Sequence, residues 1–373
     1  MSTDNYILGT NGGFLQYGYK PDNIKRDDLS WEKNQMINAG IDLQMFDGYI
    51  GFSVDYYNTN TSNMLLYVPV PLLTGYSTSL QNLGKVNNRG WELALTSQHT
   101  FANGFGYSFN ANYAKNTNEV KELGPGNAPI ISSGSVAHAY YITEVGKPIG
   151  NYYLLVQDGI FATEEDLKKY PHFDNTEVGD FRFVDVDGDG KLDLDKDRTI
   201  CGNYMPKFTY GFGGKLWYAG FDMDFNFQGV YGNKILNLNK RYLDNMEGNT
   251  NGTKIALDRW KSPENPGSGS VNKANRKQTG YNSRTSTWHL ESGSYLRLQN
   301  LSLGYTLPRA LTQKFKVEKM RVYVSGQNLF TITNYSGYNP EVNARPSKNL
   351  TPGEDYGTYP LARTYMFGLN LTL

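Results

Sequence analysis

Three aspartates spaced two residues apart form the most suggestive group of ligating side chains in the sequence. They are Asp185, Asp187 and Asp189, and Gly190 follows them. Hard carboxylate oxygens at alternate positions, before a glycine that permits a sharp turn, make up the first half of an EF-hand calcium loop. The twelfth position of such a loop is Lys196 here instead of a bidentate glutamate, so later aspartates would have to complete the ligand shell. The aspartates that could do so are Asp193, Asp195 and Asp197.

The pattern therefore predicts a calcium site formed by Asp185, Asp187, Asp189 and Asp193. The alternative is an acidic surface turn in a long loop. Calcium is the only cofactor that the sequence suggests. Cys201 is the single cysteine, which excludes an intrachain disulfide and a thiolate metal cage.

The other reactive side chains form no catalytic pattern. No two histidines have metal-ligand spacing, and we expect surface or loop positions for all of them. Glu164, Glu165 and Asp166 stand at the expected start of a helix, where negative charge favourably meets the helix dipole, so a glycosidase carboxylate pair is not needed to explain them. The sequence has no nucleophile elbow of the Gly-x-Ser-x-Gly type and no phosphate-binding glycine loop, so we expect no enzyme. The histidines are His99, His138, His172 and His289.

Two tryptophans in long polar segments are candidates for substrate contact. The rings of Trp260 and Trp288 could stack on sugar rings, or they could pack the segments that carry them. The sequence leaves both alternatives open.

The elements that must position these groups are strands, because the apolar residues recur with a period of two. The clearest example is residues 209–231, where a turn at Ala219 and Gly220 separates two alternating runs. A soluble sheet must cover its apolar face with a second layer, whereas a transmembrane barrel turns that face to lipid and its polar face to a wet lumen. In the second run, Phe221, Met223, Phe225 and Phe227 alternate with Asp222, Asp224, Asn226 and Gln228.

The same alternation predicts nine strands joined by connections that are alternately short and long. In an up-and-down barrel, this order places every short turn at one rim and every long loop at the other, as in outer-membrane barrels. We therefore predict an all-β fold, an antiparallel up-and-down transmembrane β-barrel sector of about nine strands. The short connections are 46–48, 100–104, 219–220 and 308–319, and the long ones are 58–88, 116–206, 233–292 and 329–362.

Four local features add detail to this pattern. A helix is expected at 164–170, because Thr163 can cap it and Pro171 stops it. A second helix is expected near 254–260, and a bulge in the strand 295–307, because the apolar parity changes within it. Residues up to Lys20 are expected to form a loop.

Composition agrees with strands at a membrane. Aromatic residues make up 14% of the chain, and the mean hydropathy is −0.56. No apolar run of about 20 residues is present for a membrane helix. The 36 basic and 36 acidic residues balance without a Lys/Arg cluster, which argues against a nucleic-acid partner. The N-terminus lacks the basic and apolar regions of a signal peptide.

Eight stretches, in order along nearly the whole chain, resemble the SusC/RagA family of TonB-dependent outer-membrane transporters. They are LSWE at 29–32, VDYYN at 54–58, GKVNNRG at 84–90, GDF at 179–181 running into DVDGDG at 185–190, DRW at 258–260, YLRLQNL at 295–301, SGQNLF at 325–330 and GYNPE at 337–341.

The resemblance implies a barrel of about 22 strands that is filled by an N-terminal plug. It further implies energy supplied through TonB, a location in the outer membrane, and a SusD-like surface lipoprotein that hands over oligosaccharides or other nutrients. Residues 1–373 would be the C-terminal part of such a barrel, without signal peptide, TonB box, plug or roughly the first dozen strands. We therefore expect no transport by this chain alone. The alternative from another class is a β-rich surface glycan-binding protein with a calcium-stabilised loop and no transport role.

Overall fold

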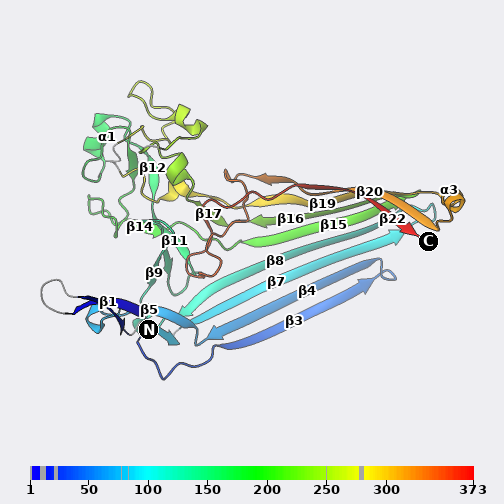
Figure 1. Ribbon diagram of the computed structural model, residues 1–373, viewed down its shortest axis with the longest axis horizontal. Coiled ribbons are helices and arrows are strands. Elements are labelled where there is room, and N and C mark those ends of the chain that lie inside the picture. Colours follow the sequence, from blue (N-terminus) through cyan, green and yellow to red (C-terminus); the bar gives the residue numbers. More distant parts are fainter. Residues whose placement is uncertain are drawn as a thin grey trace.

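A single antiparallel sheet of nine strands dominates the fold (Figure 1). The computed structural model describes residues 2–8, 14–20, 24–76, 78–82, 84–248, 250–276 and 281–373. Each strand of the sheet pairs with the next long strand along the chain, which is the up-and-down order that the sequence predicts. In sheet order, the strands are β3 (Lys33–Met45), β4 (Ile50–Ser62), β7 (Lys85–Thr100), β8 (Gly106–Glu122), β15 (Phe208–Tyr218), β16 (Phe221–Tyr231), β19 (Tyr295–Thr306), β20 (Lys319–Thr333) and β22 (Thr364–Thr372).

The short and long connections lie at opposite ends of the sheet (Figure 1). The tight turns β3–β4, β7–β8 and β15–β16 lie at one end, together with α3 (Arg309–Thr312) and η5 (Gln313–Phe315) between β19 and β20. At the other end, the long connections gather into what we call the loop lobe, defined as the described residues of 123–207, 232–294 and 334–363. This confirms the predicted fold class and its segregation of loops.

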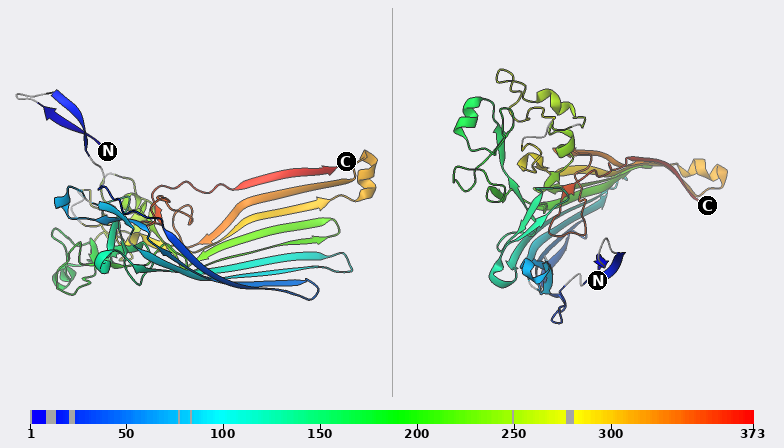
Figure 2. Two further views of the ribbon diagram at one scale, coloured as in Figure 1. Left: turned by 90° about the horizontal axis from the view of Figure 1, so that it is seen from below. Right: turned by 60° about the vertical axis from the view of Figure 1, so that its left-hand side comes forward.

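The sheet curves so that its strands sweep out part of a cylinder wall (Figure 2). The pairing register of the strands places apolar side chains on one face of the sheet and polar side chains on the other. Phe225 pairs with Leu301 on β19, while the adjacent Asp224 pairs with Ser302 and with Lys215 on the neighbouring strands. A sheet with one apolar and one polar face results, as the alternation predicts.

Several strands run further toward the lobe than the apolar alternation indicates, so the predicted loops 58–88, 116–206 and 329–362 begin later or end earlier than expected. Polar side chains continue the pairing there. Asn87 of β7 donates from Nδ2 to Asn58 Oδ1 at 2.6 Å and to Asn60 Oδ1 at 3.0 Å on β4. Backbone pairing thus persists where polar side chains surround a single apolar pair, Val86 and Val120.

Of two further predictions about single elements, the one for the first residues differs from the structure and the one for the bulge in β19 is confirmed. The first residues, expected as a loop, form a paired hairpin of β1 (Ser2–Leu8) and β2 (Phe14–Lys20). The bulge in β19 is confirmed, because the pairing shifts between Leu298 and Asn300 against both neighbours.

The loop lobe contains small sheets and short helices. The expected helix at 164–170 is α1 (Glu164–Lys169), and Thr163 and Asp166 form its capping box. The segment near 254–260 forms η3 (Lys254–Asp258), a 3₁₀ helix. Within the described residues, no helix is both long enough and apolar enough to cross a membrane. The strands are β9 (Ile130–Ser133), β10 (Tyr140–Thr143), β11 (Asn151–Leu155), β12 (Gln157–Ile160), β13 (Phe181–Phe183), β14 (Arg198–Ile200), β17 (Lys234–Asn237), β18 (Leu290–Ser292) and β21 (Glu354–Asp355).

The lobe also holds most of the buried apolar side chains. One cluster surrounds Tyr141, Tyr152 and Leu236, and a second surrounds Phe181 and Phe183. The remaining elements are the hairpin β5 (Leu65–Pro69) and β6 (Thr78–Asn82), with η1 (Leu72–Thr74) between them, and the short helices α2 (Lys240–Leu243), η2 (Pro125–Asn127) and η4 (Thr287–His289).

Candidate functional site

The polar face of the sheet carries a charged pair that joins two strands across the strand between them. Arg321 of β20 binds Asp222 of β16 through two hydrogen bonds, from Nε at 2.8 Å and from Nη2 at 2.5 Å. The pair passes over Gly304 of the intervening strand β19, where any Cβ would collide with the guanidinium group. One step along, Asn300 donates to Asp224 Oδ1 at 3.4 Å. Such groups need water or one another, so this face is suited to an aqueous lumen.

Nearer the lobe, a buried arginine fixes a loop to the same face. Arg297 of β19 is 2% exposed. It donates from Nε to Thr331 Oγ1 at 2.9 Å and from Nη2 to Asn339 Oδ1 at 2.9 Å, and it forms an ion pair with Glu341. Tyr295 also donates to Glu341 Oε1, at 2.5 Å. The connection that follows β20 is therefore tied to the sheet through Asn339 and Glu341.

A polar cavity of about 390 Å³ opens beside this anchor. Gln228 lies on its wall and donates from Nε2 to Glu341 Oε1 at 3.0 Å. The bulge places Gln299 there as well. Other side chains of the wall are Asn112, Thr209 and Asn226. This cavity lies where the polar face of the sheet meets the loops.

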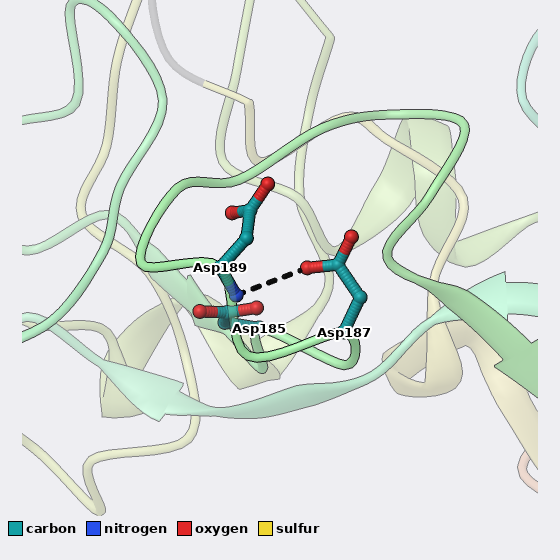
Figure 3. A group of neighbouring side chains, drawn as sticks. All are labelled: Asp185, Asp187 and Asp189. Atoms are coloured by element: carbon teal, nitrogen blue, oxygen red, sulfur yellow. Dashed lines mark hydrogen bonds between the residues drawn. The ribbon is translucent and has the colours of Figure 1, made fainter.

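The three alternate aspartates do come together on one turn (Figure 3). Each of Asp185, Asp187 and Asp189 offers a carboxylate oxygen within 4.8 Å of the others. Backbone N–H groups of the turn donate hydrogen bonds to these carboxylates. Gly188 donates to Asp185 at 2.7 Å, and the amide of Asp189 donates to Asp187 at 3.2 Å. The carboxylate oxygens are suited both to a turn closed by backbone hydrogen bonds and to a hard cation such as calcium.

The fourth predicted ligand, Asp193, lies outside this group. Its carboxylate accepts from the amides of Asp195 and Lys196, and these hydrogen bonds lower its pKa. Buried Asp197 closes the loop instead, because it accepts from Val186 at 2.8 Å and from the Asp193 amide at 2.6 Å. The structure thus gathers three of the four predicted ligands, and calcium binding stays a prediction.

Both candidate tryptophans pack against the second apolar cluster of the lobe. Trp260 donates from Nε1 to the carbonyl of Ala162 at 3.3 Å. The ring of Trp288 lies 5.2 Å from that of Phe181, and Lys240 Nζ lies 4.2 Å from its centre. Their positions match the packing alternative, and a sugar contact stays a prediction.

One histidine of the loop lobe is deeply buried, although it lies in a long loop as expected. His289 of η4 is completely buried, and its Nδ1 faces the amide of Ser286 at 3.2 Å. Burial, together with the charges of Lys240 and Arg241, lowers its pKa to about 3. The apolar neighbours Trp288 and Leu290 in the sequence are compatible with this burial.

An exposed pair of tyrosines in the loop lobe was not predicted from the sequence. Tyr338 and Tyr359, 83% and 90% exposed, line a cavity of about 410 Å³ in the lobe. Asn237, Asp244 and Thr358 also line it. Tyr338 lies within the GYNPE stretch, and this family-like motif was the feature of the sequence that could have indicated it. Exposed rings with polar neighbours can bind amphipathic ligands such as sugars.

An antiparallel sheet with an apolar outer face, a charged and polar inner face and long loops at one rim defines a wall of an outer-membrane β-barrel. The family model described as "TonB dependent receptor-like, beta-barrel" matches residues 2–329. The chain therefore belongs to the TonB-dependent receptor family, and the predicted SusC/RagA resemblance is confirmed. This membership places it in the outer membrane and does not favour the alternative of a surface glycan-binding protein.

Relatives and solved structures agree. TonB-dependent receptor P3 of Formosa agariphila is 34% identical over 357 residues, a region that covers 92% of this chain and 34% of that protein. TonB-dependent receptor SusC of Bacteroides thetaiotaomicron is 27% identical over 351 residues, covering 92% of this chain and 32% of SusC. The structure of the RagAB peptide transporter superposes with a TM-score of 0.76 at 24% identity, covering 99% of this chain and 38% of the RagAB chain. The chain spans about a third of the length of the curated relatives that it matches.

Proposed function

We propose that the chain is part of an outer-membrane transporter that imports oligosaccharides or similar nutrients. The observation that carries the proposal is the sheet itself, whose polar face holds the Arg321–Asp222 and Arg297–Glu341 pairs while its other face is apolar. A wall of this kind separates lipid from an aqueous path.

Energy would come from TonB through the plug of the whole transporter, and a SusD-like surface lipoprotein would deliver the ligand at the loop lobe. The names of the relatives, TonB-dependent receptor and SusC, support this part of the proposal. Peptides are what the RagAB transporter is named for, and they serve below as the competing class of substrate.

Oligosaccharide is the substrate class that we favour, because Tyr338 and Tyr359 expose their rings beside polar side chains in the lobe. We expect the double variant Tyr338→Ala plus Tyr359→Ala to lower uptake of labelled oligosaccharide about tenfold, from ~0.7 kcal/mol per ring. The matched control is Tyr67→Ala, which removes an exposed tyrosine from the hairpin β5–β6.

The assay uses the full-length transporter in cells with and without TonB, supplied with a neutral oligosaccharide mixture or with a peptide mixture. Import of oligosaccharides that needs TonB and both tyrosines would support the proposal. Import of peptides alone, or uptake that is the same without TonB, would contradict it.

A further inference from the structure

Three arginines from distant parts of the chain converge on the segment 137–140 of the loop lobe. Arg241 of α2 donates from Nη1 to the carbonyl of Ala137 at 3.3 Å. Arg284 contacts Nε2 of His138 through Nη1. The guanidinium carbon of Arg198 lies 3.8 Å from the centre of the Tyr140 ring. One short turn between β9 and β10 is thus surrounded by positive charge.

The protein balances little of this charge. Arg198 binds Asp195 at 3.1 Å, but the side chain of Asp195 is 87% exposed, whereas that of Arg198 is 6% exposed. Within the described residues, Arg241 and Arg284 form no ion pair. Another arginine of the lobe, Arg182, pairs with Asp158 at 2.9 Å. Buried or half-buried cations without a counter-ion are costly, so the cluster is suited to an external anion.

His138 at the centre of the cluster is held neutral. Burial and the charges of Arg284, Arg198 and Arg241 lower its pKa to about 4. Since Nε2 faces the Arg284 donor, the ring proton belongs on Nδ1. Nδ1 is buried and has no acceptor among the described residues. The histidine therefore adds no positive charge near neutral pH and presents one unpartnered donor.

The guanidinium groups retain donors for a ligand. A guanidinium has five N–H donors in a planar fork that matches the two oxygens of a carboxylate or sulfate. Within the described residues, Arg284 uses only Nη1 on His138, and Arg241 uses only Nη1 on the carbonyls of Ala137 and Ser283. Arg241 and Arg284 are half-buried, so a ligand can approach their guanidinium groups from solvent.

We propose that Arg198, Arg241, Arg284 and His138 form an oxyanion-binding site that takes the carboxylate or sulfate group of an acidic oligosaccharide. This inference rests on the proposed function for the identity of the ligand. The site shares no residue with the polar cavity of the sheet or with the turn of Asp185, Asp187 and Asp189. It would favour acidic over neutral sugars at the loop lobe, before passage through the barrel.

The test measures the reactivity of each arginine in the full-length transporter purified in detergent. Phenylglyoxal labelling, read by peptide mass spectrometry at constant ionic strength, is compared with and without four probes: inorganic sulfate, trigalacturonate, a sulfated galactan trisaccharide and neutral maltotriose. We expect sulfate and both acidic trisaccharides to reduce labelling of Arg241 and Arg284 at least fivefold. Maltotriose should leave it unchanged, and Arg182 should react equally throughout.

Variants then separate binding from packing. Arg284→Gln and Arg241→Gln should weaken binding of trigalacturonate about tenfold or more by calorimetry, whereas Arg284→Lys should recover part of it and Arg182→Gln should not change it. A proteolysis pattern equal to that of the unchanged protein verifies that each variant has folded. If a glutamine variant does not fold, the test is the protection of Arg241 and Arg284 from phenylglyoxal in the unchanged protein.

Three results would overturn the inference. These are no protection by any acidic probe, equal protection by maltotriose, or protection by sulfate with none by the acidic trisaccharides. Failure of the proposed function has a different signature, because oligosaccharide uptake would then be absent while the binding measurement on purified protein still gives its own answer.

Discussion

The nine-stranded sheet exposes apolar side chains on its outer face, whereas the loop lobe buries them in its interior. In the sheet, Phe221 and Phe367 remain 64% and 86% exposed. In the lobe, Tyr141, Tyr152 and Leu236 are completely buried against one another. The lobe carries its own core, as a soluble domain does, whereas the sheet needs lipid to cover its outer face.

The two regions also treat polar groups differently. The sheet keeps its charges on one open face, where Asp222 and Arg321 pair across strands. The lobe buries them, and Glu354 is an example. Its carboxylate accepts from the backbone and hydroxyl of Ser135 and from Tyr141. Stability of the lobe should therefore depend on internal hydrogen bonds and pH, and stability of the sheet on the membrane.

The largest effect is expected where the sheet stops. Among the described strands, β3 and β22 each pair on one side only, and each unsatisfied backbone group costs several kcal/mol in hydrocarbon. Residues 1–373 expressed alone behind a signal peptide should give no heat-modifiable barrel band and import no oligosaccharide. Full-length receptor P3, handled identically, is the control. A stable, transport-competent membrane product from these residues would refute the dependence of the sheet on further strands.

The second prediction compares the two faces of β16 at neighbouring positions. Phe225→Arg puts a charge on the lipid face and should destabilise the full-length barrel by about 2–4 kcal/mol near the midplane, as measured by urea unfolding in vesicles. Asn226→Arg, on the polar face, should change the unfolding free energy far less.

Labelling of single cysteines measures independently which face of β16 is exposed to water. A water-soluble maleimide should label cysteine at position 226 and leave cysteine at position 225 largely unlabelled. Equal destabilisation by the two arginines, or equal labelling of the two cysteines, would count against the assignment of faces.

A third, smaller effect concerns pH and the lobe. The pKa values of His138 and His289 are lowered to about 4 and about 3, so the unfolded state binds more protons than the folded one below the ordinary value of 6.5. Stability is thus complete above pH ~6.5 and declines as pH falls toward the folded values. Glu247 acts in the opposite sense, because burial raises its pKa, but its shift is smaller.

Limited proteolysis of the full-length protein at pH 7 and pH 4.5 measures this effect. The lobe should be cut faster at the lower pH, while the strands of the sheet stay protected. His289→Gln should reduce the difference, and His99→Gln, on β7 of the sheet, should not. A lobe that is equally resistant at both pH values would contradict the expected linkage.

The smallest effect is expected at the acidic turn, because it lies at the surface of the lobe. If the turn binds calcium, terbium luminescence of the full-length protein should show saturable binding that Asp187→Ala plus Asp189→Ala removes, without any change in the sheet. Asp174→Ala, another exposed aspartate of the lobe, is the control. Absence of a saturable signal in the unchanged protein would leave an acidic turn.

The sequence by itself determined the strands of the sheet and the first helix of the lobe. Alternation of apolar and polar residues is a local property, and a one-residue slip would turn a whole strand inside out, so faces and turns can be predicted from neighbours in the chain. The capping pair Thr163 and Asp166 is equally local, and α1 begins at Glu164 as this pair predicts, ending at Lys169, one residue before the predicted end. The bulge in β19 was visible as a change of parity.

Only the tertiary structure decided what the polar segments do. The strand ends near Asn58 and Asn87 carry mostly polar side chains, with Val86 as an exception, so the alternation of apolar residues stops before the pairing does. Trp288 is partly buried and His289 fully buried because residues far along the chain enclose them. The arginine cluster draws Arg198, Arg241 and Arg284 together around one turn, although more than 40 positions separate each from the next. Such meetings depend on chain topology and on packing between distant segments, and neither leaves a periodic trace in the sequence.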